Sequence, residues 1–104
     1  MSKWFSLKMS DVKRINEREG YFFFSPNTMR FFNSEIESEL YGDTYFITSD
    51  RMELKMPKEY TVREFFDDGH ISHASRFQEF ATKEEAVDFI KEIIRREHND
   101  NYKD

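Results

Sequence analysis

The pattern of apolar and polar positions changes several times along this chain, and its densest apolar stretch lies between Gly20 and Ser34. Tyr21–Phe24 is a run of four aromatic residues without polar alternation, which predicts a short strand buried on both faces. Ser25 and Pro26 then give a helix-start signal, because serine can accept a bond from a free backbone N–H and proline suits the first helical position. We therefore expect a strand followed by a short helix, with these rings in the hydrophobic core.

From residue 35 the pattern alternates with period two, which is typical of a strand with one buried face. Gly42-Asp43 is a two-residue turn signal between segments 35–40 and 44–49, so these segments are predicted to form a β-hairpin. That tip implies two cross-strand pairs, Leu40–Tyr45 and Ser38–Ile47. Phe46 falls on the face opposite to these residues, which indicates either a second covered face or a slipped register.

A second hairpin is predicted from residue 59 to residue 77, with Asp68-Gly69 at its tip. This tip implies three cross-strand pairs, Phe66–Ile71, Tyr60–Phe77 and Glu64–His73. The first two would be apolar contacts of the kind that stabilise a sheet.

Two further helices flank these strands. Ser10 is the expected N-cap of a largely polar helix over residues 11–19. Thr82 and Glu85 have the spacing of a capping box, in which each side chain bonds the backbone N–H of the other residue. The helix that follows, over residues 83–97, has a wide apolar stripe and is expected to pack on the sheet.

The predicted fold class is therefore α+β, with about five mainly antiparallel strands in two hairpins and three helices. At 104 residues the chain suits one domain, which we place at residues 1–97 with a flexible C-terminal tail at residues 98–104. Trp4, Phe5 and Leu7 are expected to dock onto the body of this domain.

Composition excludes several classes of function. The chain has no cysteine, so disulfides, thiolate nucleophiles and cysteine–zinc sites are ruled out. No apolar run approaches the ~18 residues of a membrane span, and the first residues lack the apolar block of a secretion signal. We therefore expect a cytoplasmic protein that does not bind membranes.

Charge is unevenly distributed along the chain. The overall net charge is −5, and residues 35–79 contain eleven acidic and five basic side chains. Four carboxylates, Glu35, Glu37, Glu39 and Asp43, fall within the first hairpin and suit a basic partner surface. The first hypothesis is accordingly a non-enzymatic protein that binds a host or phage protein through these residues. The ordinary alternative is a solvated acidic surface.

Nucleic-acid binding is the second hypothesis. Arg18, Arg30, Tyr21 and Phe23 combine cations with rings on which bases can stack, as in single-strand binding sites. The acidic balance of the whole domain opposes phosphate binding, so a nucleic-acid partner would contact only this N-terminal part.

Catalytic signatures are sparse. His70 and His73 are three apart on a predicted strand and point to opposite faces, which disfavours a metal site. Glu64 and His73 could form an acid–base pair, which is the basis of a third, weaker hypothesis of a hydrolase. With no nucleophile motif and three glycines, all at turns, we expect no catalytic residues, no metal and no cofactor.

The run GYFFFSPNTMRFFNS, followed by TYFITSD, EYTVREF and RFQEFATKEEA, resembles a family of small uncharacterised proteins carried by bacteriophages, plasmids and other mobile elements. The resemblance covers roughly residues 20–94. It implies an accessory protein of a mobile element inside a bacterial cell. Short acidic proteins of this kind are often inhibitors of host defence machinery, including CRISPR nucleases. The resemblance carries over no functional residues, and the oligomeric state stays open.

Overall fold

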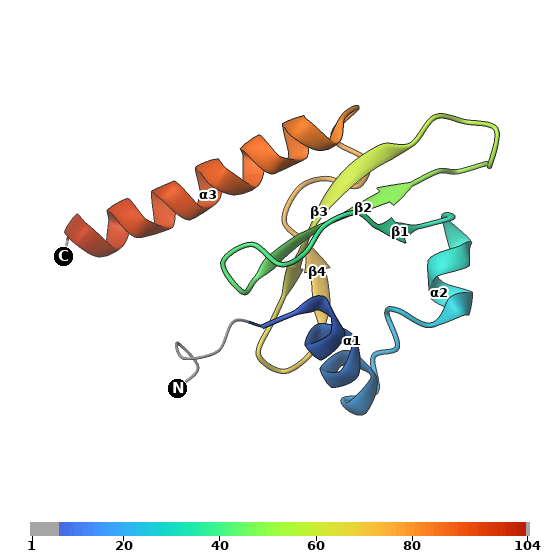
Figure 1. Cartoon of the computed structure of the whole chain (residues 1–104), viewed down its shortest axis with the longest axis horizontal. Helices are drawn as coiled ribbons and strands as arrows, with labels where there is room; N and C mark the ends of the chain where they lie inside the picture. Colours follow the sequence, from blue (N-terminus) through green and yellow to red (C-terminus); the bar gives the residue numbers. More distant parts are fainter. Residues whose placement is uncertain (1–6, 104) are drawn as a thin grey trace.

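The computed structural model describes the backbone of residues 7–103 and the side chains of residues 7–97, so Trp4 and Phe5 lie outside the described residues. The described chain forms three helices and one antiparallel four-stranded sheet of order β1-β2-β3-β4 (Figure 1). The helices are α1 (Met9–Arg18), α2 (Pro26–Phe31) and α3 (Lys83–Lys103), and the strands are β1 (Glu35–Ile36), β2 (Tyr45–Asp50), β3 (Glu59–Phe65) and β4 (Ile71–His73). The predicted α+β class is confirmed, with four strands in place of about five.

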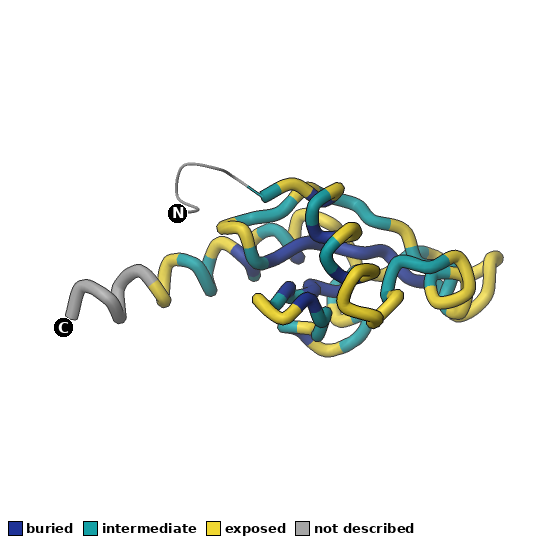
Figure 2. The backbone as a smooth tube through the Cα atoms, turned by 90° about the horizontal axis from the view of Figure 1, so that it is seen from below, coloured by how far each residue is buried: buried dark blue, intermediate teal, exposed yellow. Residues whose placement is uncertain are grey.

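The sheet is covered on both faces, with α3 on one side and α1 on the other (Figure 1). All six residues of β2 are buried, and Figure 2 shows this buried stretch running through the middle of the molecule. On the α3 face, Tyr45 and Ile47 pack with Ile90. On the α1 face, Phe46 packs with Val12. Phe46 therefore covers a second buried face, which is one of the two outcomes that its position in the sequence indicated.

The first hairpin exists, but its register differs from the prediction. Tyr41 pairs with Tyr45, so the connecting loop has three residues, and Gly42 and Asp43 both adopt positive φ of 58°. In the strands themselves Glu35 lies opposite Ser49 and Ile36 opposite Thr48. The expected Leu40–Tyr45 and Ser38–Ile47 pairs are therefore wrong. The loop has one residue more than expected, and residues 37–40 lie opposite only residues 46 and 47, so the ladder is interrupted between the tip and the strands.

The second hairpin shows the same kind of error. The Phe66 N–H donates to the carbonyl oxygen of His70 (3.0 Å), which leaves a three-residue loop that ends at Gly69 with φ +96°. A left-handed glycine at this point is typical of a three-residue hairpin loop with a bulge. Glu64 consequently lies opposite Ser72, and Arg63 opposite His73. The strand β4 ends at His73, well before residue 77.

These pairings overturn the other two predicted contacts of this hairpin. Phe65, not Phe66, faces Ile71. Tyr60 pairs with Phe80 through two backbone hydrogen bonds, so the predicted Tyr60–Phe77 pair is also wrong.

The aromatic run Tyr21–Phe24 is not a strand, which corrects the prediction of a buried strand there. Phe22 has φ +55°, which a strand cannot accommodate, and the Phe23 N–H donates to the side-chain oxygen of Asn16 (2.7 Å) instead of to a neighbouring strand. Tyr21 and Phe22 are 48% and 50% exposed. High strand propensity was insufficient here because no free sheet edge pairs with this segment.

The helix-start signals were more reliable. The Ser25 hydroxyl accepts the Thr28 N–H (3.3 Å) and Pro26 is the first residue of α2, as predicted. For α1 the predicted cap is wrong, because the helix begins at Met9, before Ser10, and Lys8 is its N-cap.

The capping box at the start of α3 is confirmed: the Glu85 N–H donates to the Thr82 hydroxyl (3.2 Å) and the Thr82 N–H donates to the Glu85 carboxylate (3.3 Å). The helix packs on β2 and β3 and continues to Lys103, beyond the expected end near Glu97. Its C-terminal end extends past the sheet (Figure 1). Flexibility of residues 98–104 stays a prediction.

Candidate functional site

The four carboxylates of the predicted partner surface are divided between two environments. Glu35 and Glu37 both contact the Lys58 ammonium, at 3.3 and 3.2 Å. Glu37 also accepts a hydrogen bond from the Ser49 hydroxyl (2.7 Å) and is only partly exposed. Burial acts to raise the pKa of Glu37, but the bonds from Ser49 and Lys58 outweigh it and leave that pKa below its ordinary value. Glu37 thus belongs to the internal structure of the hairpin.

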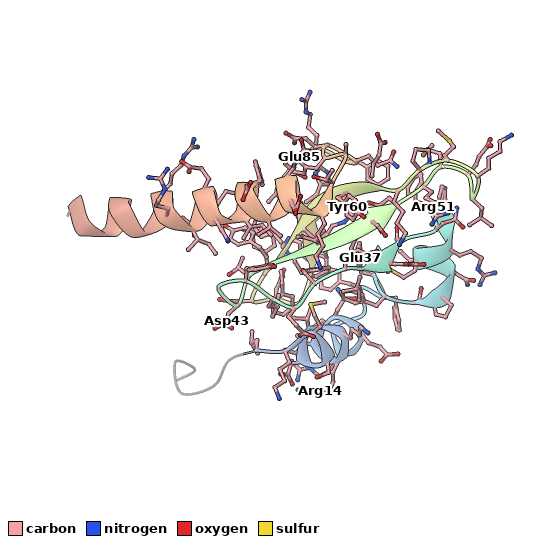
Figure 3. All side chains as sticks on the ribbon, turned by 45° about the horizontal axis from the view of Figure 1, so that its top comes forward. Arg14, Glu37, Asp43, Arg51, Tyr60 and Glu85 are labelled. Atoms are coloured by element: carbon pink, nitrogen blue, oxygen red, sulfur yellow. The ribbon has the colours of Figure 1, made fainter. Side chains whose placement is uncertain are left out.

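Glu39 and Asp43 lie further along the same ribbon and are exposed. Figure 3 shows Asp43 at the tip of the hairpin, away from Glu37. Asp43 accepts a hydrogen bond from the backbone N–H of Leu7 (3.1 Å). Within residues 7–97 neither carboxylate has an ion-pair partner, so no basic side chain of this part of the chain neutralises them.

The residues predicted to contact nucleic acid are not brought together. Arg18 pairs with the adjacent Glu19 (3.1 Å), and Arg30 donates to the side-chain oxygen of Asn27 (3.2 Å). The Tyr21 hydroxyl donates to the Asp68 carboxylate (3.3 Å), which places an acidic group beside the ring. Phe23 is partly buried and turns toward Arg63 of β3, whose guanidinium carbon lies 5.3 Å from the ring centroid.

The Glu64–His73 pair does not form. Glu64 lies opposite Ser72, so His73, the next residue along β4, projects from the other face of the sheet. The His73 ring nitrogen Nδ1 lies 2.7 Å from the carbonyl oxygen of Ser75. Burial and the nearby Glu97 carboxylate raise the pKa of Glu64, an effect that His70 partly offsets. Among the described residues no cluster of histidine and carboxylate side chains could hold a metal ion.

A groove of about 380 Å³ opens between α2 and the sheet, and the sequence patterns did not predict it. Its apolar walls come from α2, from the segments directly before and after α2, and from the segment after β4. The residues are Phe23, Met29, Phe31, Phe32 and Phe77. The rings of Phe32 and Phe77 are 4.8 Å apart and join α2 to the segment after β4. We call this site the α2 groove.

Arg63 also lines the α2 groove, although only 9% of this residue is exposed. Its Nε–H donates to the Thr48 hydroxyl (3.0 Å), and its Nη2 lies 3.5 Å from the Asp50 carboxylate. Burial lowers the pKa of Arg63, and Asp50 opposes that shift. Arginine stays protonated in either case, so a permanent cation lies beside the aromatic walls.

Asp50 is the buried counter-ion of Arg63. The Asp50 side chain is fully buried and accepts hydrogen bonds from three hydroxyls, those of Ser34, Thr48 and Thr61. These donors come from both central strands and from the segment that follows α2. The network therefore ties the position of Arg63 to the docking of α2 on the sheet.

A second exposed feature adjoins the groove. Phe31 of α2 is 75% exposed and Leu54 is 70% exposed, with Met52 and Met56 also largely in solvent. The loop that carries the last three residues is tied to α2, because the Arg51 N–H donates to the carbonyl oxygen of Phe32 (2.8 Å). We call Phe31, Met52, Leu54 and Met56 the apolar end.

A sequence signal for Arg63 did exist. In the segment 59–65, alternation places Arg63 on the same strand face as Thr61 and Phe65. A cation between buried positions indicates either an internal ion pair or a ligand site. Its partner Asp50 is 13 residues away, and nothing in the local pattern connects the two.

These features define a small α+β protein with a sheet covered on both faces, an aromatic groove with a cation in its wall, and an exposed apolar end. The chain belongs to a family of unknown function, DUF7447, whose family model matches residues 8–91. Comparison with curated proteins and with solved structures gives no match. No helix in the described part of the chain is long and apolar enough to cross a membrane.

Proposed function

We propose that this chain is a non-enzymatic binding protein that acts by docking on another protein. In this proposal it is an accessory protein of a mobile element, located in the bacterial cytoplasm. Its target is a host or phage protein, namely a defence nuclease or another nucleic-acid enzyme, which it inhibits. The observation that carries the proposal is the exposure of Phe31 on α2 and of Leu54 on the loop tied to it, since large exposed apolar side chains are typical of an interaction surface.

The apolar end adjoins the acidic hairpin of residues 35–43. Leu54 and Glu35 line the same shallow depression, of about 250 Å³, together with Met29. Met29 also lines the α2 groove, so this residue of α2 lies between the groove and the depression. Methionine side chains such as Met52 adapt readily to different apolar partners. Glu35 is therefore the carboxylate that borders the apolar end, whereas Asp43 lies at the hairpin tip, away from it (Figure 3).

The charges of the hairpin indicate what kind of partner surface to expect. Glu39 and Asp43 are exposed without an ion-pair partner in the described part of the chain, whereas Lys58 pairs with Glu35 and Glu37. Nucleic-acid enzymes carry basic surfaces that bind phosphates, and an acidic ribbon can compete for them. The expected partner surface is therefore basic, with an apolar pocket at its border.

The test begins with affinity capture from bacterial lysate, and the captured protein is then titrated with variants. Phe31→Ser combined with Leu54→Ser should weaken binding by at least ten-fold, because exposed anchors dominate such contacts. Glu39→Lys combined with Asp43→Lys should weaken binding more at low salt than at high salt. Glu84→Lys is the charge control, since Glu84 is exposed on α3. Equal affinity of all variants would reject this surface.

A nucleic-acid-binding module is the second candidate, and the half-exposed rings of Tyr21 and Phe22 favour it. The nearby Asp68 and Glu19 carboxylates oppose it. A gel shift with mixed single-stranded oligonucleotides at low salt should show no complex. A complex that Phe22→Ala abolishes would replace protein docking as the preferred function.

A further inference from the structure

The α2 groove contains one ionisable side chain among the residues that line it, and that side chain is Arg63. The remaining polar lining residues, Asn27, Thr28 and Ser34, are uncharged. Asp50 lies beneath Arg63 and is fully buried, so its carboxylate is not presented to the groove. A molecule that enters therefore meets a cation and apolar walls, with no competing anion in contact.

The hydrogen-bond donors of Arg63 are only partly used. Nε is engaged by Thr48, and Nη2 has a long 3.5 Å contact to Asp50, whose carboxylate is already bonded by three hydroxyls. Nη1 has no hydrogen-bond acceptor within the described part of the chain. A guanidinium has five N–H donors in a fixed plane. Its outer edge can therefore still donate two hydrogen bonds to the two oxygens of a carboxylate.

Aromatic rings hold this guanidinium in place. The guanidinium carbon lies 5.3 Å from the centroid of Phe23 and 5.7 Å from that of Phe77, both within cation–π range. The same two rings form walls of the groove, so a ligand that reaches Arg63 must pass along apolar surface. A site of this kind selects ligands by the charge that meets Arg63 and by the shape of the apolar part that meets the walls.

We propose that the α2 groove is a binding site for a small organic carboxylate with an apolar, preferably aromatic, body. The carboxylate accepts hydrogen bonds from the Nη1 and Nη2 groups of Arg63, and the apolar body packs against Phe31, Phe32 and Phe77. The volume of about 380 Å³ lies near the lower limit of typical ligand pockets, so it suits a compact molecule. This site is distinct from the protein contact proposed above, although Phe31 borders both.

The probe is 4-phenylbutyrate, with its primary amide and with 4-phenylbutylamine as matched neutral and cationic compounds. Titration is followed by amide and arginine Nε–H shifts in two-dimensional NMR spectra of the whole chain. We expect saturable shifts at residues 28–34 and at Arg63, with a dissociation constant in the low millimolar range or below for a ligand of about 12 non-hydrogen atoms. The acid should bind about ten-fold more tightly than its amide, and the amine should not bind.

Variants at the mouth of the groove test the charge preference without disturbing Arg63. Phe31 is 75% exposed, so its replacement leaves the fold intact. Both Phe31→Glu and Phe31→Lys remove the same ring contact and should weaken binding, but Phe31→Lys should retain about ten-fold more affinity for 4-phenylbutyrate than Phe31→Glu, because only the sign of the new charge differs. Leu54→Glu, at a similarly exposed residue outside the groove, is the control and should change the affinity by less than about two-fold.

The proposal is overturned by any of three results. The acid and the amide could bind equally, which would remove the role of Arg63. The shifts could fall outside the residues that line the groove. The spectra could show no saturation at 20-fold above the expected dissociation constant. Because none of these measurements involves a protein partner, failure here and failure of the docking proposal are distinguishable.

Discussion

Replacement of Asp50 by asparagine tests whether the buried network holds the protein together around Arg63. The change keeps the size of the side chain but removes the negative charge. It also puts an NH₂ group where Ser34, Thr48 and Thr61 donate hydrogen bonds. Arg63 would then be a cation with 9% exposure and no buried counter-ion. An uncompensated charge of this kind is among the costliest single changes in a protein.

The magnitude follows from the geometry. Removal of one partner from a buried ion pair costs about 3–5 kcal/mol. The Arg63–Asp50 contact is long at 3.5 Å, and asparagine retains one acceptor oxygen, so we expect the lower end, about 3 kcal/mol. A domain of 104 residues has a free energy of unfolding of about 5–15 kcal/mol, so this loss is a large fraction of the total. The melting temperature should fall by about 12–24 °C.

Urea unfolding followed by circular dichroism measures this loss, with the slope of the transition as a check on two-state behaviour. Asp43→Asn is the matched control, because Asp43 is exposed and the same change there should cost under about 0.5 kcal/mol. Adding Arg63→Met to Asp50→Asn should recover about 1–3 kcal/mol relative to the sum of the single changes. A loss below about 1 kcal/mol for Asp50→Asn, or additivity of the two changes, would refute the reasoning.

Three further predictions concern the packing and electrostatics of the fold. Ile90→Ala should lower the free energy of unfolding by about 2–5 kcal/mol, because Ile90 is fully buried between α3 and the sheet. Urea unfolding checks this against Lys91→Ala, and a loss under about 1 kcal/mol would show that α3 does not pack there. Gly69→Ala should cost about 1–3 kcal/mol, because φ is +96° and the new Cβ would lie 3.0 Å from Glu19 Cγ and 3.3 Å from the Ile15 carbonyl oxygen. Gly20→Ala, with φ +86° but open space around it, has the same backbone strain without the contacts, so equal melting temperatures for both variants would contradict this account. Glu37 has a folded-state pKa below its ordinary 4.5, so it stabilises the protein above that pH, and its contribution is lost as the pH falls through the folded-state value. Glu37→Gln should therefore be destabilised at pH 7 in thermal unfolding, with a deficit that shrinks below pH 4.5; a deficit independent of pH would argue against the ionised form.

Local sequence signals predicted the starts of α2 and α3 and the existence of the two hairpins. Thr82 and Glu85 lie three residues apart and bond each other's backbone, and Ser25 and Pro26 act within one helical turn. Both hairpins were predicted because glycine occurs at each tip. Such features depend on neighbours along the chain, so the sequence contains all the information that they need.

The registers could not be derived in the same way. Each hairpin loop has three residues where two were expected, and the single extra residue moved His73 away from Glu64. The run Tyr21–Phe24 failed as a strand for a related reason. Strand propensity describes how well side chains fit a pleated surface, but a strand also needs a partner with free backbone groups.

The candidate site depended entirely on tertiary contacts. Glu37 is bonded to Ser49 and Lys58 and only partly exposed, which the sequence did not indicate, and its role in partner binding stays a prediction. Arg63 was not predicted as a site residue, because its significance comes from Asp50 on the neighbouring strand and from the groove beneath α2.

The sequence by itself therefore determined the α+β class, the starts of α2 and α3 and the existence of two hairpins, since each follows from residues within a few positions of one another. The tertiary structure decided strand register, which rings are exposed, which carboxylates are paired with a basic side chain, and where a buried cation meets a cavity. The physical reason is that burial and charge compensation are properties of contacts between distant segments, and these contacts form only when the chain packs.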